Sequence, residues 1–204
     1  MNLILLRASL RGLSAYRALL DTPVLSEVLR LLDAIAQKEG ETALEAYNQL
    51  FYDLRAEGRS GLGSWLWDAL RYTETPFGSL VSAGKRDTAL EAAARQDLDT
   101  LLLLPQIAAE DIRAALSPLL GAEYNSVLSQ LPALEPGSPF TSEDLVRFYQ
   151  EHGDGLYAKY RAFLWEEGQL IPVADPDCPH PVELLGYDQQ RKQVLDNTRL
   201  LVEG

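Results

Sequence analysis

The chain has 204 residues, a net charge of −12 at pH 7 and an apolar content of 47%. This is enough to bury one substantial core, or one core plus an appendage, and it excludes an intrinsically disordered protein. The negative charge disfavours nucleic-acid binding, which needs clustered Lys and Arg. Cys178 is the single cysteine, so a disulfide framework is excluded and a reducing, cytoplasmic compartment is expected. No apolar run approaches the ~20 residues that a transmembrane helix requires.

Residues 1–20 predict an amphipathic helix that carries positive charge. They contain three arginines and no acidic residue. We expect this helix to pack on the core through one apolar face, which consists of Leu3, Leu6, Leu10, Leu13 and Leu20. Two alternatives are an organelle transit peptide and a helix that lies on a membrane surface.

Apolar residues at helical spacing dominate the chain from residue 22 to residue 131. Thr22 and Pro23 predict the start of the first of these helices, and Gly40 predicts its end. Further helices are expected within the ranges 41–57, 62–76, 87–104, 110–119 and 122–131. No fixed repeat period is present. We therefore predict a mainly α protein in which residues 1–131 form an irregular multi-helix bundle or an α-solenoid-like domain.

The proline-rich residues 132–140 mark the predicted domain boundary, because prolines favour an extended linker. Thr141 and Asp144 then predict a capping box at the start of a new helix. Glu167-Gly168 predicts the turn of one short β-hairpin near the C-terminus. Residues 141–181 are thus expected to form a helix, the hairpin and a connector with three prolines, and residues 182–204 a final helix.

Two groups of aromatic residues could form binding surfaces. Trp65 and Trp67 cannot share one helical face, so we expect one in the core and the other partly exposed. The second group surrounds the predicted hairpin and consists of Tyr149, Tyr157, Tyr160, Phe163 and Trp165. This group forms either the hairpin's own small core or a docking face.

The segment from Gly78 to Arg86 resembles a phosphate-binding loop but does not meet its requirements. Five residues rather than four separate its glycines, and Arg86 stands where a hydroxyl must bind Mg²⁺. We predict a loop between helices. The chain also contains several pairs of acidic residues, such as Glu143 and Asp144, which are expected on solvated faces rather than in a catalytic site.

A cluster of metal-binding residue types occurs at Asp175, Asp177, Cys178 and His180. The spacing of Cys178 and His180 is too short for the usual zinc pairings, and interleaved prolines restrict how the side chains converge. A polar linker without a metal is therefore the preferred interpretation. His152, the other histidine of the chain, is expected at the end of a helix.

Four C-terminal segments, taken in order, resemble an uncharacterised bacterial family of AAA+-like, P-loop ATP-binding proteins. They are Tyr157-Ala-Lys-Tyr-Arg-Ala-Phe-Leu-Trp, Leu170-Ile-Pro-Val-Ala-Asp-Pro, Leu184-Leu-Gly-Tyr-Asp-Gln-Gln-Arg-Lys and Asn197-Thr198. In that family an N-terminal region precedes the ATPase core. The resemblance therefore implies that this chain is such an N-terminal region, truncated before the P-loop.

The same resemblance implies where nucleotide would be contacted. In AAA+ ATPases a Leu-hydrophobic-Gly-aromatic-acidic stretch precedes the first ATPase helix. By this resemblance the backbone of Gly186 and Tyr187 would contact adenine, and Leu184 and Leu185 would form an apolar wall. ATP and Mg²⁺ are implied for the longer parent protein. No cofactor or metal is expected in this chain, whose sequence contains no P-loop.

We therefore expect an interaction or regulatory domain that binds a protein partner or substrate protein and couples it to an ATPase core in cis. A homo-oligomer is a further arrangement compatible with the sequence. One alternative is a free-standing small helical enzyme with a polar pocket around His152 or His180. Another is a membrane-surface or scaffold protein that uses residues 1–20. An exposed groove in the helical domain, with exposed aromatic residues on the hairpin, would favour the interaction domain.

Overall fold

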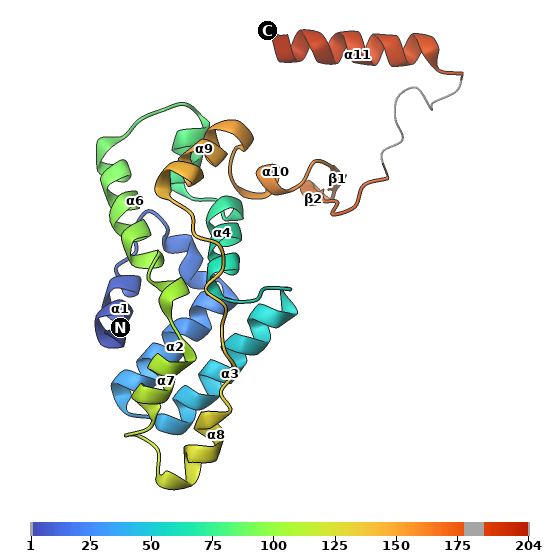
Figure 1. Ribbon diagram of the computed structural model, residues 1–204. Coiled ribbons are helices and arrows are strands. Elements are labelled where there is room, and N and C mark those ends of the chain that lie inside the picture. The colour runs from blue at the N-terminus through green and yellow to red at the C-terminus, as the bar shows by residue number, and fades with distance from the viewer. Residues whose placement is uncertain (1, 178–185, 204) are drawn as a thin grey trace. The chain divides into compact units, whose positions relative to one another are not determined.

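Helices make up most of the described chain, and an antiparallel β-hairpin lies near its C-terminus, as the sequence predicts. The computed structural model describes residues 2–177 and 186–203 (Figure 1). By packing, the chain divides into a helical unit, Met1–Lys159, and a C-terminal unit, Tyr160–Gly204. The helical unit contains α1 (Leu3–Arg11), η1 (Arg17–Asp21), α2 (Pro23–Gln37), α3 (Gly40–Ala56), α4 (Leu62–Tyr72), α5 (Pro76–Ser82), α6 (Thr88–Leu101), η2 (Leu104–Gln106), α7 (Ala109–Leu116), η3 (Ala122–Tyr124), α8 (Asn125–Ser129), α9 (Ser142–His152) and α10 (Gly155–Lys159). The C-terminal unit contains β1 (Phe163–Glu166), β2 (Gln169–Pro172) and α11 (Asp188–Glu203).

The helix starts follow the capping signals of the sequence. The Asp87 side chain accepts hydrogen bonds from two backbone N–H groups in the first turn of α6, at 2.9 and 3.0 Å. Thr141 and Asp144 form the predicted capping box at the start of α9. Thr22 holds the predicted cap position of α2, although its side chain makes no capping hydrogen bond to that helix.

The turn between α2 and α3 differs from the prediction at Gly40. Lys38 caps the end of α2 in the left-handed conformation (φ 63°), and Gly40 is the first residue of α3. Gly40 is buried against Leu120, and a Cβ at this position would lie 2.7 Å from the Leu120 Cδ2 atom. The glycine is therefore required for close packing and not for ending a helix.

The apolar face of α1 is buried, as the core-packing interpretation predicts. Leu3, Leu6 and Leu10 are at most 8% exposed, and α1 packs on α2 and α6. Two arginines of α1 form ion pairs with Asp33 of α2. In the folded chain this face is not available to a membrane surface, which argues against that alternative. Within the described residues no helix is long and apolar enough to cross a membrane.

A buried carboxylate joins α6 to the loop that follows α1. Asp97 is 4% exposed, and its Oδ2 atom accepts hydrogen bonds from the backbone N–H groups of Ser14 (2.8 Å) and Tyr16 (3.0 Å). Bonds to a charged acceptor are stronger than neutral ones, and a buried N–H group without an acceptor is costly. Asp97 therefore fixes the chain between α1 and η1 against α6.

Residues 131–140, here called the return strap, run without helix or strand structure from α8 to α9 (Figure 1). The Glu135 N–H group donates a hydrogen bond to the Ser60 carbonyl (3.2 Å), just before α4. Gly63 permits the close approach of the strap, because a Cβ at this position would lie 1.9 Å from the Pro136 carbonyl oxygen. The strap is therefore packed on the helical unit along the start of α4.

Side-chain contacts hold the return strap at both ends. The Tyr47 hydroxyl of α3 donates a hydrogen bond to the Pro132 carbonyl (2.6 Å), and Leu131 is buried in the core. At the other end the Phe140 ring lies against Trp67 of α4, with a centroid separation of 4.7 Å. The strap is thus held at both ends and near its middle, at Glu135 and Pro136, and it leads directly into α9.

Helix α9 packs on α4 and α5 and belongs to the helical unit. Leu145 and Tyr149 are fully buried, and the Tyr149 hydroxyl donates a hydrogen bond to the Leu70 carbonyl of α4 (2.5 Å). By packing, the unit extends to Lys159, whereas the sequence places a boundary at residues 132–140. The difference arises because the apolar face of α9 is visible in the sequence but the surface that covers it is not.

The C-terminal unit contains the predicted hairpin and the final helix. Strands β1 and β2 are antiparallel, with Trp165 opposite Leu170. Glu167 and Gly168 both have positive φ (48° and 84°), as a two-residue type I′ turn requires. The predicted connector, which ends at Pro181, lies partly outside the described residues.

We expect Asp97→Ala to lower the free energy of unfolding by about 2–4 kcal/mol, because two buried N–H groups lose their acceptor. Asp97→Asn keeps a carbonyl oxygen at this position, so it should lower the free energy of unfolding by a smaller amount. Asp99→Ala, at an exposed position of the same helix, should change the value by less than about 0.5 kcal/mol. Urea denaturation of the three variants measures this, and equal losses for Asp97→Ala and Asp99→Ala would contradict the role of Asp97.

Candidate functional site

The segment from Gly78 to Arg86 does not form a phosphate-binding loop. Residues 78–82 are the C-terminal part of α5, and residues 83–87 connect α5 to α6. Among the described residues no strand precedes α5. The prediction of a loop is correct for the second half of the segment and wrong for the first half, because those residues continue the helix that Pro76 begins.

The predicted Asp-Cys-His cluster at residues 175–180 is only partly described. Its two aspartates lie in the described chain, whereas Cys178 and His180 lie outside it. No group of three or more metal-binding side chains that could hold an ion occurs in residues 2–177 and 186–203. His152 is the last residue of α9, as predicted, and its ring stacks on Phe148 with centroids 4.9 Å apart.

Two of the four residues assigned to adenine contact by resemblance are described. Gly186 has a φ of 84°, with open space where a side chain would stand. Tyr187 is 61% exposed, and its carbonyl accepts a hydrogen bond from the Arg191 N–H group (2.8 Å) at the start of α11. Leu184 and Leu185 lie outside the described residues. The local structure is a glycine turn that leads into a helix, and the adenine contact stays a prediction.

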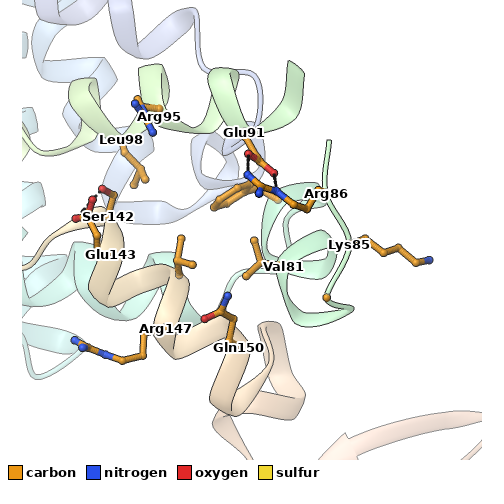
Figure 2. Close-up of a pocket in the computed structure, with 13 residues that line it drawn as sticks. Val81, Lys85, Arg86, Glu91, Arg95, Leu98, Ser142, Glu143, Arg147 and Gln150 are labelled. Carbon is orange, nitrogen blue, oxygen red and sulfur yellow. Dashed lines mark hydrogen bonds and ion pairs between the residues drawn. The ribbon is translucent and has the colours of Figure 1, made fainter. Parts of the chain in front are cut away.

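A groove of about 500 Å³ lies within the helical unit between α5, α6 and α9 (Figure 2). Its floor is apolar, with Phe77 and Val81 from α5, Leu98 from α6 and Val146 from α9. The volume lies within the ~300–1,000 Å³ typical of ligand sites. The groove therefore has the size and the apolar floor of a binding site.

Helical spacing aligns the side chains that line the groove. Glu91, Arg95 and Leu98 stand on one face of α6, and Val146 and Gln150 stand on one face of α9. The spacing is visible in the sequence, but every amphipathic helix has such a face. The sequence does not show that these two faces line the same groove, because this depends on the path of the return strap. Sequence reasoning therefore missed this site.

The groove carries an excess of positive charge in a chain whose net charge is −12. Its charged side chains are Lys85, Arg86, Arg95 and Arg147, with Glu91 and Glu143 as the two acidic residues. Arg86 and Glu91 form a two-pronged ion pair, with N–O distances of 3.0 and 2.9 Å (Figure 2). Arg147 pairs with Asp144. Within the described residues neither Lys85 nor Arg95 forms an ion pair.

Both carboxylates of the groove are held in the ionised form. The Arg86 guanidinium lowers the pKa of Glu91. Hydrogen bonds from its own backbone N–H group and from the Ser142 hydroxyl lower the pKa of Glu143. A general acid at neutral pH needs a raised pKa, and the described residues that line the groove include no His or Cys. Neither carboxylate therefore has the raised pKa of a general acid.

Two buried tyrosines support the floor of the groove. The Phe77 ring meets the rings of Tyr16 and Tyr149 edge-on, with centroid separations of 6.1 and 6.2 Å. Burial raises the pKa of both tyrosines, so both hydroxyls stay neutral at physiological pH. Phe77 is thus held by rigid neighbours.

The two tryptophans of α4 take the positions that their spacing predicts. Trp65 is 4% exposed in the core, and Trp67 is partly exposed. The Arg71 guanidinium lies over the rings of Trp67 (4.7 Å) and Phe148 (5.0 Å). Trp67 therefore helps to join α4 to α9 and is largely covered by its neighbours.

Comparisons of the chain with protein-family models, with curated proteins and with solved structures found no match. The function must therefore be inferred from the residues and their geometry.

We expect alkaline titration to separate the buried tyrosines from the exposed ones. Burial raises the pKa of Tyr47 to about 12 and also raises the pKa values of Tyr16 and Tyr149. Because the folded pKa values exceed the unfolded value of ~10, the stability that these groups contribute is complete below this pH and is lost as the pH rises above it.

Phenolate absorbance and far-UV circular dichroism, followed together, measure this separation. The three buried tyrosines should ionise only as the helical signal is lost. Ionisation of all nine tyrosines with the helical signal intact would contradict the packing described around Phe77.

Proposed function

We propose that this chain is an interaction module of an AAA+-like ATPase. In this proposal the helical unit binds a protein partner or substrate protein. The C-terminal unit connects it to an ATPase core in cis, and the protein is cytoplasmic. The placement of recognition in an N-terminal domain and of ATP hydrolysis in a core is common among motor ATPases, and this part of the argument is an analogy.

The exposed apolar side chains of the β-hairpin carry the proposal. Leu164 is 54% exposed, Trp165 69%, Leu170 43% and Ile171 41%. Because side chains alternate along a strand, Leu164 and Ile171 lie on one face of the hairpin and Trp165 and Leu170 on the other. A two-stranded hairpin with water on both faces is marginally stable, and exposed apolar surface often marks an interaction site. The hairpin thus has the features of a docking element.

The groove of the helical unit supports binding over catalysis as the role of that unit. Its floor is apolar, and both of its carboxylates, Glu91 and Glu143, are ionised. His152, a residue on which the alternative of a small enzyme relies, stacks on Phe148 outside this groove and lines a separate surface pocket with Asp144 and Glu151. An interaction module therefore accounts for this surface better than an enzyme does.

The link to an ATPase rests on the resemblance of residues 157–198, which include Gly186 and Tyr187. Helix α11 adds support, because Val194 and Leu200 are 63% and 70% exposed. The first helix of a larger domain would bury such side chains against that domain. ATP and Mg²⁺ would bind to the longer protein. The chain of 204 residues should bind ATP weakly or not at all, because its sequence has no P-loop.

We expect the native reading frame to continue past codon 204 into a hydrophobic strand and a P-loop. In the longer protein the hairpin should be covered by the ATPase core. Acrylamide quenching measures this through Trp165, whose contribution is isolated by comparison with Trp165→Phe. Trp165 should be strongly quenched in the chain of 204 residues and protected in the longer protein, because docking excludes the quencher.

The buried Trp65 provides an internal control, since its accessibility should be the same in both proteins. A stop codon directly after Gly204 would remove the basis of the ATPase proposal. A reading frame that continues while Trp165 stays equally accessible would instead show that the hairpin does not dock on the core.

A further inference from the structure

The groove between α5, α6 and α9 combines an apolar floor with more cationic than acidic side chains. Val81, Leu98 and Val146 come from three different elements and lie on the same floor. Figure 2 shows Lys85 and Arg147 extending outward at opposite sides of the groove, and Arg95 at a third position on the rim. The groove therefore carries cationic side chains at three positions along its rim.

Two of the groove's cations are available to a ligand. Arg86 forms an ion pair with Glu91, and Arg147 forms an ion pair with Asp144. Lys85 and Arg95 are exposed and form no ion pair among the described residues, and Arg95 also attracts Glu91 and Glu143 at longer range. Available positive charge beside an apolar floor is complementary to carboxylates that flank an apolar side chain.

The groove is held open by contacts that do not involve its available cations. Phe77 is packed between two buried tyrosines. The next residue, Gly78, lies against Asp154, which follows α9, and a Cβ on the glycine would lie 2.9 Å from the Asp154 Cβ. The Ser79 hydroxyl donates a hydrogen bond to the same aspartate (3.0 Å). The α5–α9 side of the groove is therefore pre-formed, which lowers the cost of binding.

We propose that this groove binds a short acidic protein segment, in which an apolar side chain enters the floor and neighbouring carboxylates meet Arg95 and Lys85. The proposal rests on the proposed role of the helical unit in binding a protein partner, and it names the chemistry of that partner. Two available cations in a chain of charge −12 are too few for nucleic acid, which needs many phosphate contacts. An anionic membrane surface is disfavoured by the same net charge.

Fluorescence polarisation of the full 204-residue chain with labelled peptide pools tests the proposal. In the acidic pool, Leu or Phe recurs at every third or fourth position and Asp or Glu fills the others. In the basic pool, Lys replaces the acids, and in the polar pool, Ser replaces Leu and Phe. Non-specific attraction to a chain of charge −12 would favour the basic pool, so preference for the acidic pool has to come from a local site.

We expect the acidic pool to bind most tightly, with an affinity that falls as salt is raised. Arg95→Glu should weaken this binding by about tenfold or more, because an attraction becomes a repulsion. Arg55→Glu provides a matched control, because Arg55 lies on α3, which contributes no residue to the groove. This substitution should change the affinity for the acidic pool by less than about twofold. Both arginines are exposed, so circular dichroism should show unaltered folding for both variants.

Three results would overturn the proposal. They are no binding of the acidic pool, tighter binding of the basic pool, and equal effects of Arg95→Glu and Arg55→Glu. Binding of dodecanoate that depends on Arg95, without binding of the acidic pool, would assign the groove to small amphipathic anions instead. Each of these results is independent of the reading frame past codon 204, so failure of this proposal is distinguishable from failure of the ATPase link.

Discussion

The backbone contact between the return strap and the start of α4 is the constraint on which the position of α9, and with it the groove, depends. Neither Gly61 nor Gly63 has a side chain, so the carbonyl oxygens of Glu135 and Pro136 can lie where a Cβ would otherwise stand. This contact sets the direction in which the chain returns from α8 and delivers α9 to α4 and α5. The groove exists because α9 is held there, so the candidate site follows from a contact between loop backbone and helix rather than from helix pairing alone.

The two units of the chain have different physical characters, which suggests a division of roles. The helical unit buries its own apolar residues, joins distant segments through groups such as Asp97 and Tyr149, and carries a groove with fixed walls. The C-terminal unit exposes apolar side chains on both faces of its hairpin and along α11. This contrast favours an arrangement in which the helical unit recognises a partner and the C-terminal unit attaches to another domain. The proposal that this domain is an ATPase rests on the resemblance alone.

Local signals predict much of the fold, whereas contacts between distant residues are not predicted. Thr141 and Glu167-Gly168 fix a cap and a turn through residues no more than three apart, and the sequence identifies both of them. The role of Gly40 was assigned wrongly because its partner, Leu120, is distant in sequence. The groove was missed for the same reason. Its lining residues come from three helices, and each helix shows only an ordinary amphipathic face until the strap brings α9 beside the others.

Equilibrium unfolding of two truncated chains tests most directly the claim that the helical unit is one body closed by the strap and α9. A chain of residues 1–159 should unfold in a single transition, with the midpoint of the corresponding transition in the 204-residue chain. A chain of residues 1–140 should be markedly less stable, because Leu145 and Tyr149 no longer fill the core. Equal stability of the two truncated chains would show that α9 is an independent appendage, and the groove would then lose its structural basis.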